Sequence, residues 1–309
     1  MITTVTLNPM LDKTVYVDRI RRGETERASR IEMVVGGKGV NVSRQLKRLG
    51  VETLAVGFAG GETGDLIERL INEEDIPHEF IRVGGMTREG MTYRESDGTI
   101  TAVFEPPHRI TSEDAQELVD SVAEKIPQSD WVVCSGSSPS PEADDVFATI
   151  IRLANEQSVK TVLDSYGTAC KKAAQSIPTI LKMNKHEYEQ TLGQTLAGED
   201  DLRQMFDDLL GQGIATCIVT DGALPIYAAT SARRWKIIPP KSTVVNPTGS
   251  GDSMVGGMLY GFIQGWDEER ALRFGAAAGS SNAQRWEVAN SSPEEISSLE
   301  SKVTVEILS

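Results

Sequence analysis

Short runs of β-branched residues alternate with longer stretches of helical periodicity along most of this chain. The expected strands lie at residues 2–7, 53–58, 131–135, 160–164, 180–183 and 216–220, and the expected helices at 38–49, 63–74, 112–125, 142–156, 200–212, 252–264 and 268–285. Thr111 and Pro141 stand where a cap and a first-turn proline would begin two of these helices. Because parallel strands need crossover connections, the alternation predicts a mostly parallel sheet covered by helices on both faces.

Two segments, 13–35 and 86–104, break this alternation. Both have the two-residue period of strands, with T-V-Y-V and R-I-E-M-V-V in the first and M-T-Y-R and T-I-T-A-V-F in the second, and no helix separates the strands. Four short strands outside the main pattern predict a small projecting sheet, which could cover a site, pair with a second subunit, or do both. An antiparallel extension of the main sheet is the alternative.

The formal charge of -14 argues against a nucleic-acid-binding surface, which needs clustered basic residues, and disfavours binding to anionic membranes. The start of the sequence does not read as a signal peptide, and no apolar run reaches the ~18–20 residues of a membrane helix. We therefore expect a cytoplasmic protein. Cys134, Cys170 and Cys217 are odd in number and widely spaced, which predicts core residues and neither disulfides nor a zinc site.

The glycine-rich turn Gly36-Gly37-Lys38-Gly39 lies between an expected strand and an expected helix. Glycines permit a tight turn and close approach of a ligand, and a helix N-terminus favours an anion. Lys38 opposes the helix dipole there, and an anionic ligand would remove that conflict. A tight turn with a solvated lysine explains the same residues, so both interpretations stay open.

A second glycine-rich turn, N-P-T-G-S-G-D at 246–252, precedes an apolar helical pattern. Its backbone N–H groups could form a nest for developing negative charge, with Asp252 as the chemical group. Asp is also a favoured N-cap, so a purely structural role for Asp252 is the alternative. Neither glycine-rich segment matches a Walker A loop or the dinucleotide-binding fingerprint.

A third segment, N-K-H-E at 184–187, follows a short strand and leads into a helix. Asn184 and Glu187 share one face of a turn, and an amide with a carboxylate suits a hydrated Mg²⁺ held through few protein ligands. Glu187 could equally serve only as a partner for the helix dipole. His186 has no second imidazole near it in the sequence, which disfavours a histidine-based metal site.

Together these segments resemble the ribokinase-like (PfkB) carbohydrate kinases. The first glycine-rich segment with the helix after it (36–50) and N-P-T-G-S-G-D-S-M-V-G-G resemble the two signature segments of the family, and N-K-H-E resembles its N-x-x-E metal motif. Further matching segments follow in the expected order: T-L-N-P-M-L-D (6–12), Thr87-Arg88, S-G-S-S-P (135–139) and L-D-S-Y-G (163–167). The resemblance runs from Thr3 to Ser292. It implies a three-layer α/β/α sandwich, one kinase domain over 1–309, and a β-sheet lid formed by 13–35 and 86–104.

Within the family the chain is most similar to the hexose-phosphate branch. That similarity implies an ATP- and Mg²⁺-dependent kinase that converts a ketohexose monophosphate, fructose 1-phosphate or tagatose 6-phosphate, into a bisphosphate. A 6-phosphofructokinase, a kinase of an unphosphorylated sugar or nucleoside, and a non-catalytic sugar-phosphate binding protein remain alternatives. The resemblance also implies a homodimer formed through the lid. It leaves the need for a monovalent cation open.

The resemblance assigns roles to residues on the acceptor side of the site. Asp252 would be the general base, and the backbone of Gly249, Ser250 and Gly251 would stabilise the transferring phosphoryl group. The groups expected to hold the acceptor fall into two sets: Asp12, Gly37 and Asn41 for the sugar hydroxyls, and Lys38, Arg88, Ser137 and Arg27 for the phosphate.

On the donor side, Asn184 and Glu187 would act on ATP through Mg²⁺. Other residues would line the nucleotide pocket: Thr220, Gly222, Gly249, Gly251 and the segment 276–282, which includes Asn282. The chain departs from the family pattern at Ser138, Met183 and Asp221. These departures bear on substrate preference and nucleotide contacts.

Overall fold

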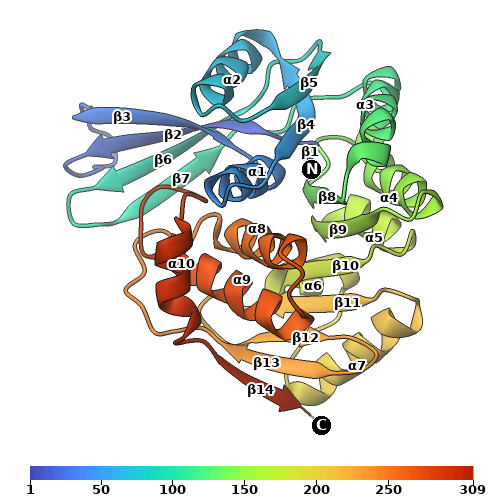
Figure 1. Ribbon diagram of the computed structural model, residues 1–309. Coiled ribbons are helices and arrows are strands. Elements are labelled where there is room, and N and C mark those ends of the chain that lie inside the picture. The colour runs from blue at the N-terminus through green and yellow to red at the C-terminus, as the bar shows by residue number, and fades with distance from the viewer. Residues whose placement is uncertain (309) are drawn as a thin grey trace.

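The computed structural model describes residues 1–308 and contains the expected three-layer α/β/α sandwich around one large sheet (Figure 1). The strand order is β14-β13-β12-β11-β10-β9-β8-β1-β4-β5. The strands are β1 (Ile2–Thr6), β4 (Thr53–Gly60), β5 (His78–Val83), β8 (Trp131–Gly136), β9 (Lys160–Ser165), β10 (Ile180–Asn184), β11 (Thr216–Thr220), β12 (Ile226–Ala229), β13 (Arg234–Ile238) and β14 (Thr304–Leu308). Neighbouring strands from β5 to β11 are parallel, and β11 to β14 pair antiparallel.

Helices cover both faces of this sheet. One layer contains α1 (Lys38–Arg48), α2 (Gly61–Glu73), α8 (Ser250–Ile263), α9 (Glu268–Ala283) and α10 (Pro293–Glu300); the other contains α3 (Ser112–Lys125), α4 (Val146–Glu156), α5 (Gly167–Ala174), α6 (Lys185–Leu192) and α7 (Glu199–Gly211). Strand β8 illustrates the packing, because Val132 and Cys134 join one apolar cluster while Trp131 and Val133 join the other. A strand buried on both faces is typical of a parallel sheet.

Several elements differ from the expected ones. Thr111 caps α3 through a capping box with Asp114, as the sequence indicates, but Pro141 opens a short 3-10 turn (Pro141–Ala143) and the helix itself begins at Val146. Six strands and α-helices were not expected: β5, β12, β13, β14, α5 and α10. The strands β12 and β13 form a hairpin with no intervening helix, so a rule based on alternation does not find them.

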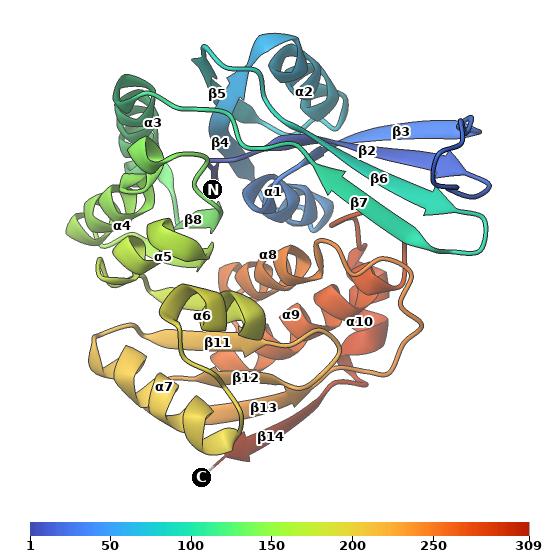
Figure 2. The same cartoon turned by 180° about the vertical axis from the view of Figure 1, so that it is seen from behind.

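The two segments outside the main pattern form a separate four-stranded sheet, with the order β3-β2-β6-β7. Its strands are β2 (Met10–Val17), β3 (Arg30–Gly36), β6 (Glu89–Glu95) and β7 (Ile100–Phe104). This second sheet projects from the main body in both views (Figures 1 and 2). It is therefore not an extension of the main sheet.

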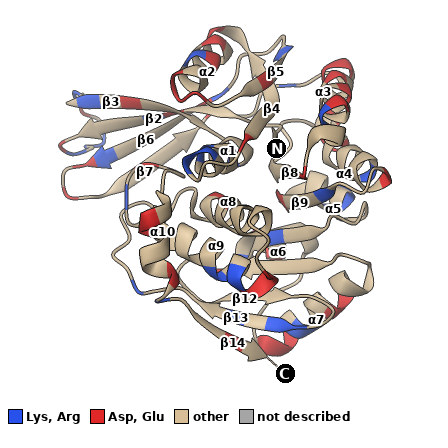
Figure 3. Ribbon diagram, viewed as in Figure 1, with Lys and Arg blue, Asp and Glu red and all other residues tan. Residues whose placement is uncertain are grey.

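Charged residues are dispersed, with Lys and Arg spread among acidic residues on many elements (Figure 3). All three cysteines are buried and free, in agreement with the expectation of core residues. Across residues 1–308, none of the helices combines the length and the apolar character needed to cross a membrane.

Candidate active site

The expected site residues gather where the parallel strands of the main sheet end. Asn8 and Ser137 lie just after β1 and β8, and Asp164, Asn184 and Thr220 lie at the ends of β9, β10 and β11. The N-termini of α1 and α8 lie at the same edge of the sheet. Lys38 of α1 and Asp252 of α8 are close enough there to interact electrostatically. Ligands of open α/β sheets characteristically bind at the carboxyl ends of the strands.

Asp252 lies in the first turn of α8 and does not cap the helix. The N-cap is Gly249, whose φ of 76° falls in the left-handed region that favours glycine, and no side chain makes a capping bond. The Asp252 side chain is 5% exposed, and its Oδ2 accepts a hydrogen bond of 2.8 Å from Nδ2 of Asn41. The structural alternative considered from the sequence, a helix cap, is therefore wrong.

The environment of Asp252 makes it a stronger base than an ordinary carboxylate. Burial, followed by repulsion from the nearby Asp164 carboxylate, raises its pKa to about 6, although Lys38 and the hydrogen bond from Asn41 partly oppose the rise. A pKa just below neutral keeps the group ionised at neutral pH and able to accept a proton. These are the properties of a general base.

Asn282 holds the glycine-rich loop that carries Asp252. Its Nδ2 donates to the Thr248 carbonyl at 2.8 Å and to Oγ of Ser250 at 3.0 Å, while its Oδ1 accepts from the Ala289 N–H at 2.7 Å. The side chain is 1% exposed. The amide therefore stabilises the conformation of the loop, a role that the sequence did not suggest, and its expected nucleotide contact stays a prediction.

Lys38 lies between two carboxylates. Its Nζ donates to Asp164 Oδ1 at 2.9 Å and to Glu187 Oε1 at 2.6 Å. Burial alone would lower the pKa of Lys38, but these two carboxylates outweigh burial and raise it. The conflict between a lysine and the helix dipole is thus resolved within the chain, by two acidic groups.

Asp164 and Lys182 form a buried ion pair beside the loop of Asp252. Lys182 Nζ lies 2.8 Å from Asp164 Oδ2, and their side chains are 3% and 0% exposed. Burial would raise the pKa of Asp164, but Lys182 and Lys38 together lower it to about 2. A Cβ on Gly251 would lie 2.7 Å from Lys182 Nζ, so glycine lets the ammonium approach the loop. The sequence analysis assigned a role to neither residue: Asp164 appeared only within the matching segment L-D-S-Y-G, and the available signal for Lys182 was a lysine inside the apolar strand β10.

Asn184 and Glu187 form a reciprocal capping box at the start of α6. Asn184 Oδ1 accepts from the Glu187 N–H at 2.8 Å, and Glu187 Oε2 accepts from the Asn184 N–H at 3.0 Å. No cluster of three or more His, Cys, Asp or Glu residues suited to a metal occurs within 1–308. One amide and one carboxylate at this helix start would suit a hydrated ion held by few protein groups and by phosphate oxygens.

A polar group formed by Asn8, Arg88 and Ser137 lies on the other side of the site. Asn8 Nδ2 donates to Ser137 Oγ at 3.1 Å, and Arg88 Nη2 lies 3.4 Å from the Asn8 carbonyl oxygen. Among the described residues, the buried atoms Nε of Arg88 and Oδ1 of Asn8 have no hydrogen-bond partner. Buried polar atoms are rarely left unpaired, so these two indicate a bound polar ligand or water.

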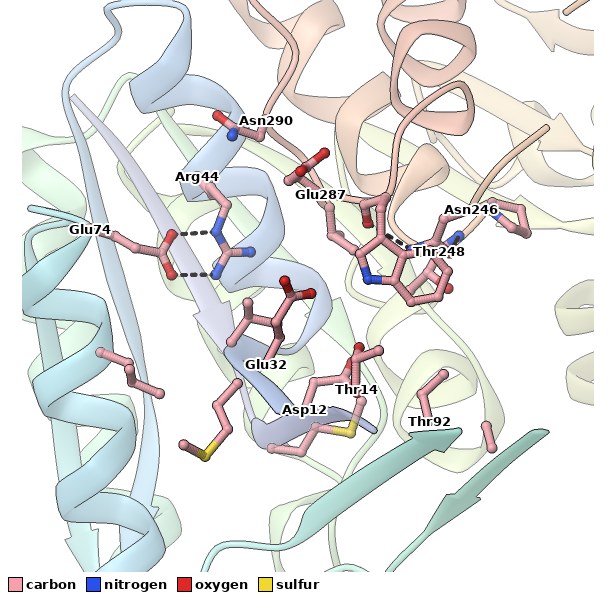
Figure 4. Close-up of a pocket in the computed structure, with 18 of the residues that line it drawn as sticks. Asp12, Thr14, Glu32, Arg44, Glu74, Thr92, Asn246, Thr248, Glu287 and Asn290 are labelled. Atoms are coloured by element: carbon pink, nitrogen blue, oxygen red, sulfur yellow. Dashed lines mark hydrogen bonds and ion pairs between the residues drawn. The ribbon is translucent and has the colours of Figure 1, made fainter. Parts of the chain in front are cut away.

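Asp12 on β2 lines a cavity of about 1030 Å³ between the second sheet, α1 and the loops near 246–248 and 286–290 (Figure 4). Burial raises the pKa of Asp12, and Arg88 and Arg44 only partly offset the rise. Gly37 has a φ of 126°, and a Cβ there would lie 2.8 Å from the Thr6 methyl group. The turn next to Asn41 therefore requires glycine.

Three further expected residues make no side-chain contact with Asp252, Asn41 or Lys38 that is recorded within 1–308. Thr220 is half-buried at the end of β11, and Gly222, with a φ of 55°, lies in the turn that follows. Arg27 is exposed on the connection between β2 and β3 and makes no ion pair with any residue of 1–308. The structure thus brings Asp252, Asn41 and Lys38 together and leaves Arg27 in solvent.

The fold and the site define a phosphotransferase of the ribokinase-like type, which passes a phosphoryl group to a hydroxyl. The model of the pfkB family carbohydrate kinases matches residues 5–295, and this chain belongs to that family. Its 1-phosphofructokinase relative from Bacillus subtilis is 35% identical over 286 residues, and a tagatose-6-phosphate kinase from Staphylococcus epidermidis is 32% identical over 286 residues; each match covers 92% of both chains.

A solved structure extends the similarity to the fold. Phosphofructokinase-2 from Escherichia coli, in complex with potassium, superposes with a TM-score of 0.91 at 25% identity, covering 97% of this chain and 98% of that one. The kinase class and the sandwich fold expected from the sequence are therefore confirmed. ATP is the phosphoryl donor of this family.

Proposed function

We propose that this chain transfers the γ-phosphate of ATP to a hydroxyl group of a ketohexose monophosphate, giving a bisphosphate and ADP. The observation that carries the proposal is the buried Asp252 carboxylate, which lies on a glycine-rich helix N-terminus and has a raised pKa. The Arg88 guanidinium nitrogen Nε, which has no hydrogen-bond partner among residues 1–308, supports an acceptor that already bears a phosphate. The names of the two relatives indicate fructose 1-phosphate or tagatose 6-phosphate as that acceptor.

In this mechanism the chain positions the acceptor and receives one proton. Asp12, Asn41 and the backbone at Gly37 hold the sugar hydroxyls, so that the reacting hydroxyl faces Asp252. As its oxygen bonds to the γ-phosphorus, the proton passes to Asp252 and the bond to the β-phosphate oxygen breaks, releasing ADP. The N–H groups of Gly249, Ser250 and Gly251 stabilise the charge on the moving phosphoryl group.

The acceptor phosphate is assigned to Arg88, Ser137 and Lys38. An ammonium has three donors, and Lys38 uses two of them on Asp164 and Glu187, which leaves one for the phosphate. Arg88 is the stronger anchor because its Nε donor has no partner in the described part of the chain and because it can bind a phosphate through two N–H groups. Lys38 therefore contributes less to phosphate binding than the sequence indicates.

On the nucleotide side, Thr220 and Gly222 are assigned to the adenosine and Asn184 and Glu187 to a hydrated Mg²⁺. When bound, the ion neutralises phosphate charge. Glu187 can turn toward it only by loosening its bond to Lys38. Because the Escherichia coli structure contains potassium, activity should also be compared in potassium and tetramethylammonium salts, where equal rates would exclude a monovalent cation requirement.

We further propose that the second sheet is a lid that pairs with the lid of a second copy. Register places Val34, Ala102 and Phe104 on the sheet face that carries Asp12, and Val34 and Phe104 are exposed in the single chain. Arg27, which is exposed on the connection between β2 and β3, keeps its expected assignment to the acceptor phosphate as a prediction. Phe104→Glu should convert a dimer to a monomer in sedimentation equilibrium. A wild-type chain that is monomeric at micromolar concentration would contradict this proposal.

The acceptor class is tested by ADP release with fructose 1-phosphate, tagatose 6-phosphate, fructose 6-phosphate, fructose and tagatose in parallel. We expect one of the first two to give the highest kcat/KM. Arg88→Gln should lower kcat/KM for that acceptor by about 10- to 100-fold, because it removes charge-assisted hydrogen bonds to phosphate, and should leave unphosphorylated sugars unchanged.

The matched control is Arg82→Gln, which removes an exposed arginine paired with Asp65 on the surface. It should change neither set of acceptors. An unphosphorylated sugar as the best acceptor, or an equal loss on all acceptors in Arg88→Gln, would refute the phosphate assignment. Calorimetric binding of a sugar phosphate without ADP release would support a non-catalytic binding protein instead.

A further inference from the structure

Arg44, on α1 one turn after Asn41, makes hydrogen bonds to three different groups. Its Nη1 donates to Asn41 Oδ1 at 2.8 Å, its Nη2 donates to the Val35 carbonyl at 2.8 Å and to Glu74 Oε1 at 2.9 Å, and its Nε donates to Glu74 Oε2. Figure 4 shows the paired contacts between Arg44 and Glu74. The Arg44 side chain is 12% exposed. The planar guanidinium of Arg44 is thus fixed by hydrogen bonds on several sides.

This arrangement determines which end of the Asn41 amide faces the base. An arginine can only donate, so the Asn41 atom that it contacts must be the oxygen. The amide nitrogen then points the other way, and it donates to Asp252 Oδ2 at 2.8 Å. Without Arg44 the amide could rotate and present its oxygen to the Asp252 carboxylate, which would repel it.

We propose that Arg44, held by Glu74, is a positioning residue that fixes the Asn41 amide and through it the carboxylate of Asp252. The inference rests on the proposed role of Asp252 as the base. The contact with the Val35 carbonyl adds a second effect, because Val35 pairs with Leu11 in β3 and β2 next to Asp12. One guanidinium therefore links α1 both to the Asn41 amide that contacts the base and to β3, the strand paired with the one that carries Asp12.

The test is a double-mutant cycle on kcat/KM with Arg44→Gln and Asn41→Ala, measured with the acceptor that the wild type prefers. Arg44→Gln should lower kcat/KM by about 10- to 100-fold, the loss expected for misorienting a hydrogen bond to a charged group. When Asn41 is already replaced by Ala, Arg44→Gln should lower kcat/KM by less than about threefold, because the effects of two residues that act through one contact are not additive. Independent, multiplying losses would overturn the inference while leaving the proposed function intact.

Two further variants separate positioning from packing. Arg44→Lys keeps the positive charge opposite Glu74 but lacks the planar set of guanidinium donors. It should therefore retain the wild-type melting temperature and still lose most of the activity. Full activity in this variant would overturn the inference. Lys47→Met is the matched control, because Lys47 lies one turn further along α1 and donates to the Glu74 backbone carbonyl. It should keep wild-type kcat/KM, and a loss equal to that of Arg44→Gln would assign the effect to the contact between α1 and α2.

A readout that does not need turnover comes from the side-chain amide of Asn41. Its NMR signals in ¹⁵N-labelled protein are assigned by their loss in Asn41→Ala. They should shift in Arg44→Gln and stay in place in Lys47→Met. Unshifted signals in Arg44→Gln would overturn the inference, whereas absence of ADP release by the wild type with every acceptor would overturn the proposed function.

Discussion

Replacing Asp252 with Asn is expected to lower kcat by about 10²- to 10⁴-fold, the range of general acid–base catalysis. Asparagine keeps the shape of the side chain but cannot accept the proton of the sugar hydroxyl. Sugar-phosphate affinity should change by only a few-fold, because binding is assigned to Arg88, Asp12 and Asn41. Steady-state kinetics and calorimetry on the same preparation measure the two quantities.

Ser253→Ala is the matched control for this variant. Ser253 follows Asp252 on α8, is fully buried, and its hydroxyl has no hydrogen-bond partner among the described residues. Its removal should leave kcat close to the wild-type value. A near-normal kcat in Asp252→Asn, or an equal loss in both variants, would contradict the assignment of Asp252 as the base.

The pH dependence of the rate checks the same assignment. Because the pKa of Asp252 is raised to about 6, kcat/KM should fall tenfold per pH unit below about pH 6, where the carboxyl is protonated. The second ionisation of a sugar phosphate falls near the same pH. The pH profile of the residual activity of Asp252→Asn distinguishes the ionisation of Asp252 from that of the substrate. A decrease in rate at acid pH that persists in this variant belongs to the sugar phosphate. An acid limb near pH 4 in the wild type would contradict the raised pKa.

Lys182→Met is expected to lower the free energy of unfolding by about 3–5 kcal/mol at pH 7, the usual cost of removing one partner of a buried ion pair. Asp164 is fully buried and would keep only the partly exposed Lys38 as a cationic partner. This is the largest stability effect expected among the variants considered. Urea unfolding of the wild type and the variant measures it.

The pH dependence of this difference has a definite sign. In the wild type the pKa of Asp164 is lowered to about 2. The ion pair therefore contributes its full stability at pH values above the ordinary pKa of an aspartate, and this contribution is lost as the pH falls toward 2. In Lys182→Met the pKa of Asp164 rises, and its carboxylate takes up a proton as the pH is lowered from 7. The difference in free energy of unfolding between the wild type and Lys182→Met should therefore become smaller as the pH is lowered.

Lys172→Met provides the control for stability. Lys172 pairs with Asp145, and both side chains are exposed, so its loss should leave the unfolding curve unchanged within error. A destabilisation of less than about 1 kcal/mol in Lys182→Met would contradict the assigned importance of the buried pair.

The sequence predicts much of the sandwich because the evidence for it is local. A helix or a buried strand is recognisable from its own periodicity, and each crossover helix implies a parallel neighbour. The strands β12 and β13 form an antiparallel hairpin with no helix between them, and β14 at the far edge pairs antiparallel with β13 although three helices separate the two strands in the sequence. Local periodicity carries no information about such partners.

The site likewise contains residues that local sequence predicts and contacts that it does not predict. Asp252, Asn184 and Glu187 are recognisable because each lies in a short segment with a characteristic composition. The pairing of Lys38 with Asp164 and Glu187 is not recognisable, because these carboxylates are 126 and 149 residues away from it in the sequence. Only the fold reveals that a lysine predicted to await a phosphate already has two carboxylates.

The reaction itself is most directly tested by ³¹P NMR of the wild type with ATP, Mg²⁺ and the preferred ketohexose monophosphate. The account predicts that the γ-phosphate signal of ATP disappears while ADP and a second phosphomonoester on the sugar appear in equal amounts, and that Asp252→Asn all but abolishes this change. ADP accompanied by inorganic phosphate, or an unchanged spectrum for every sugar phosphate that binds, would contradict it.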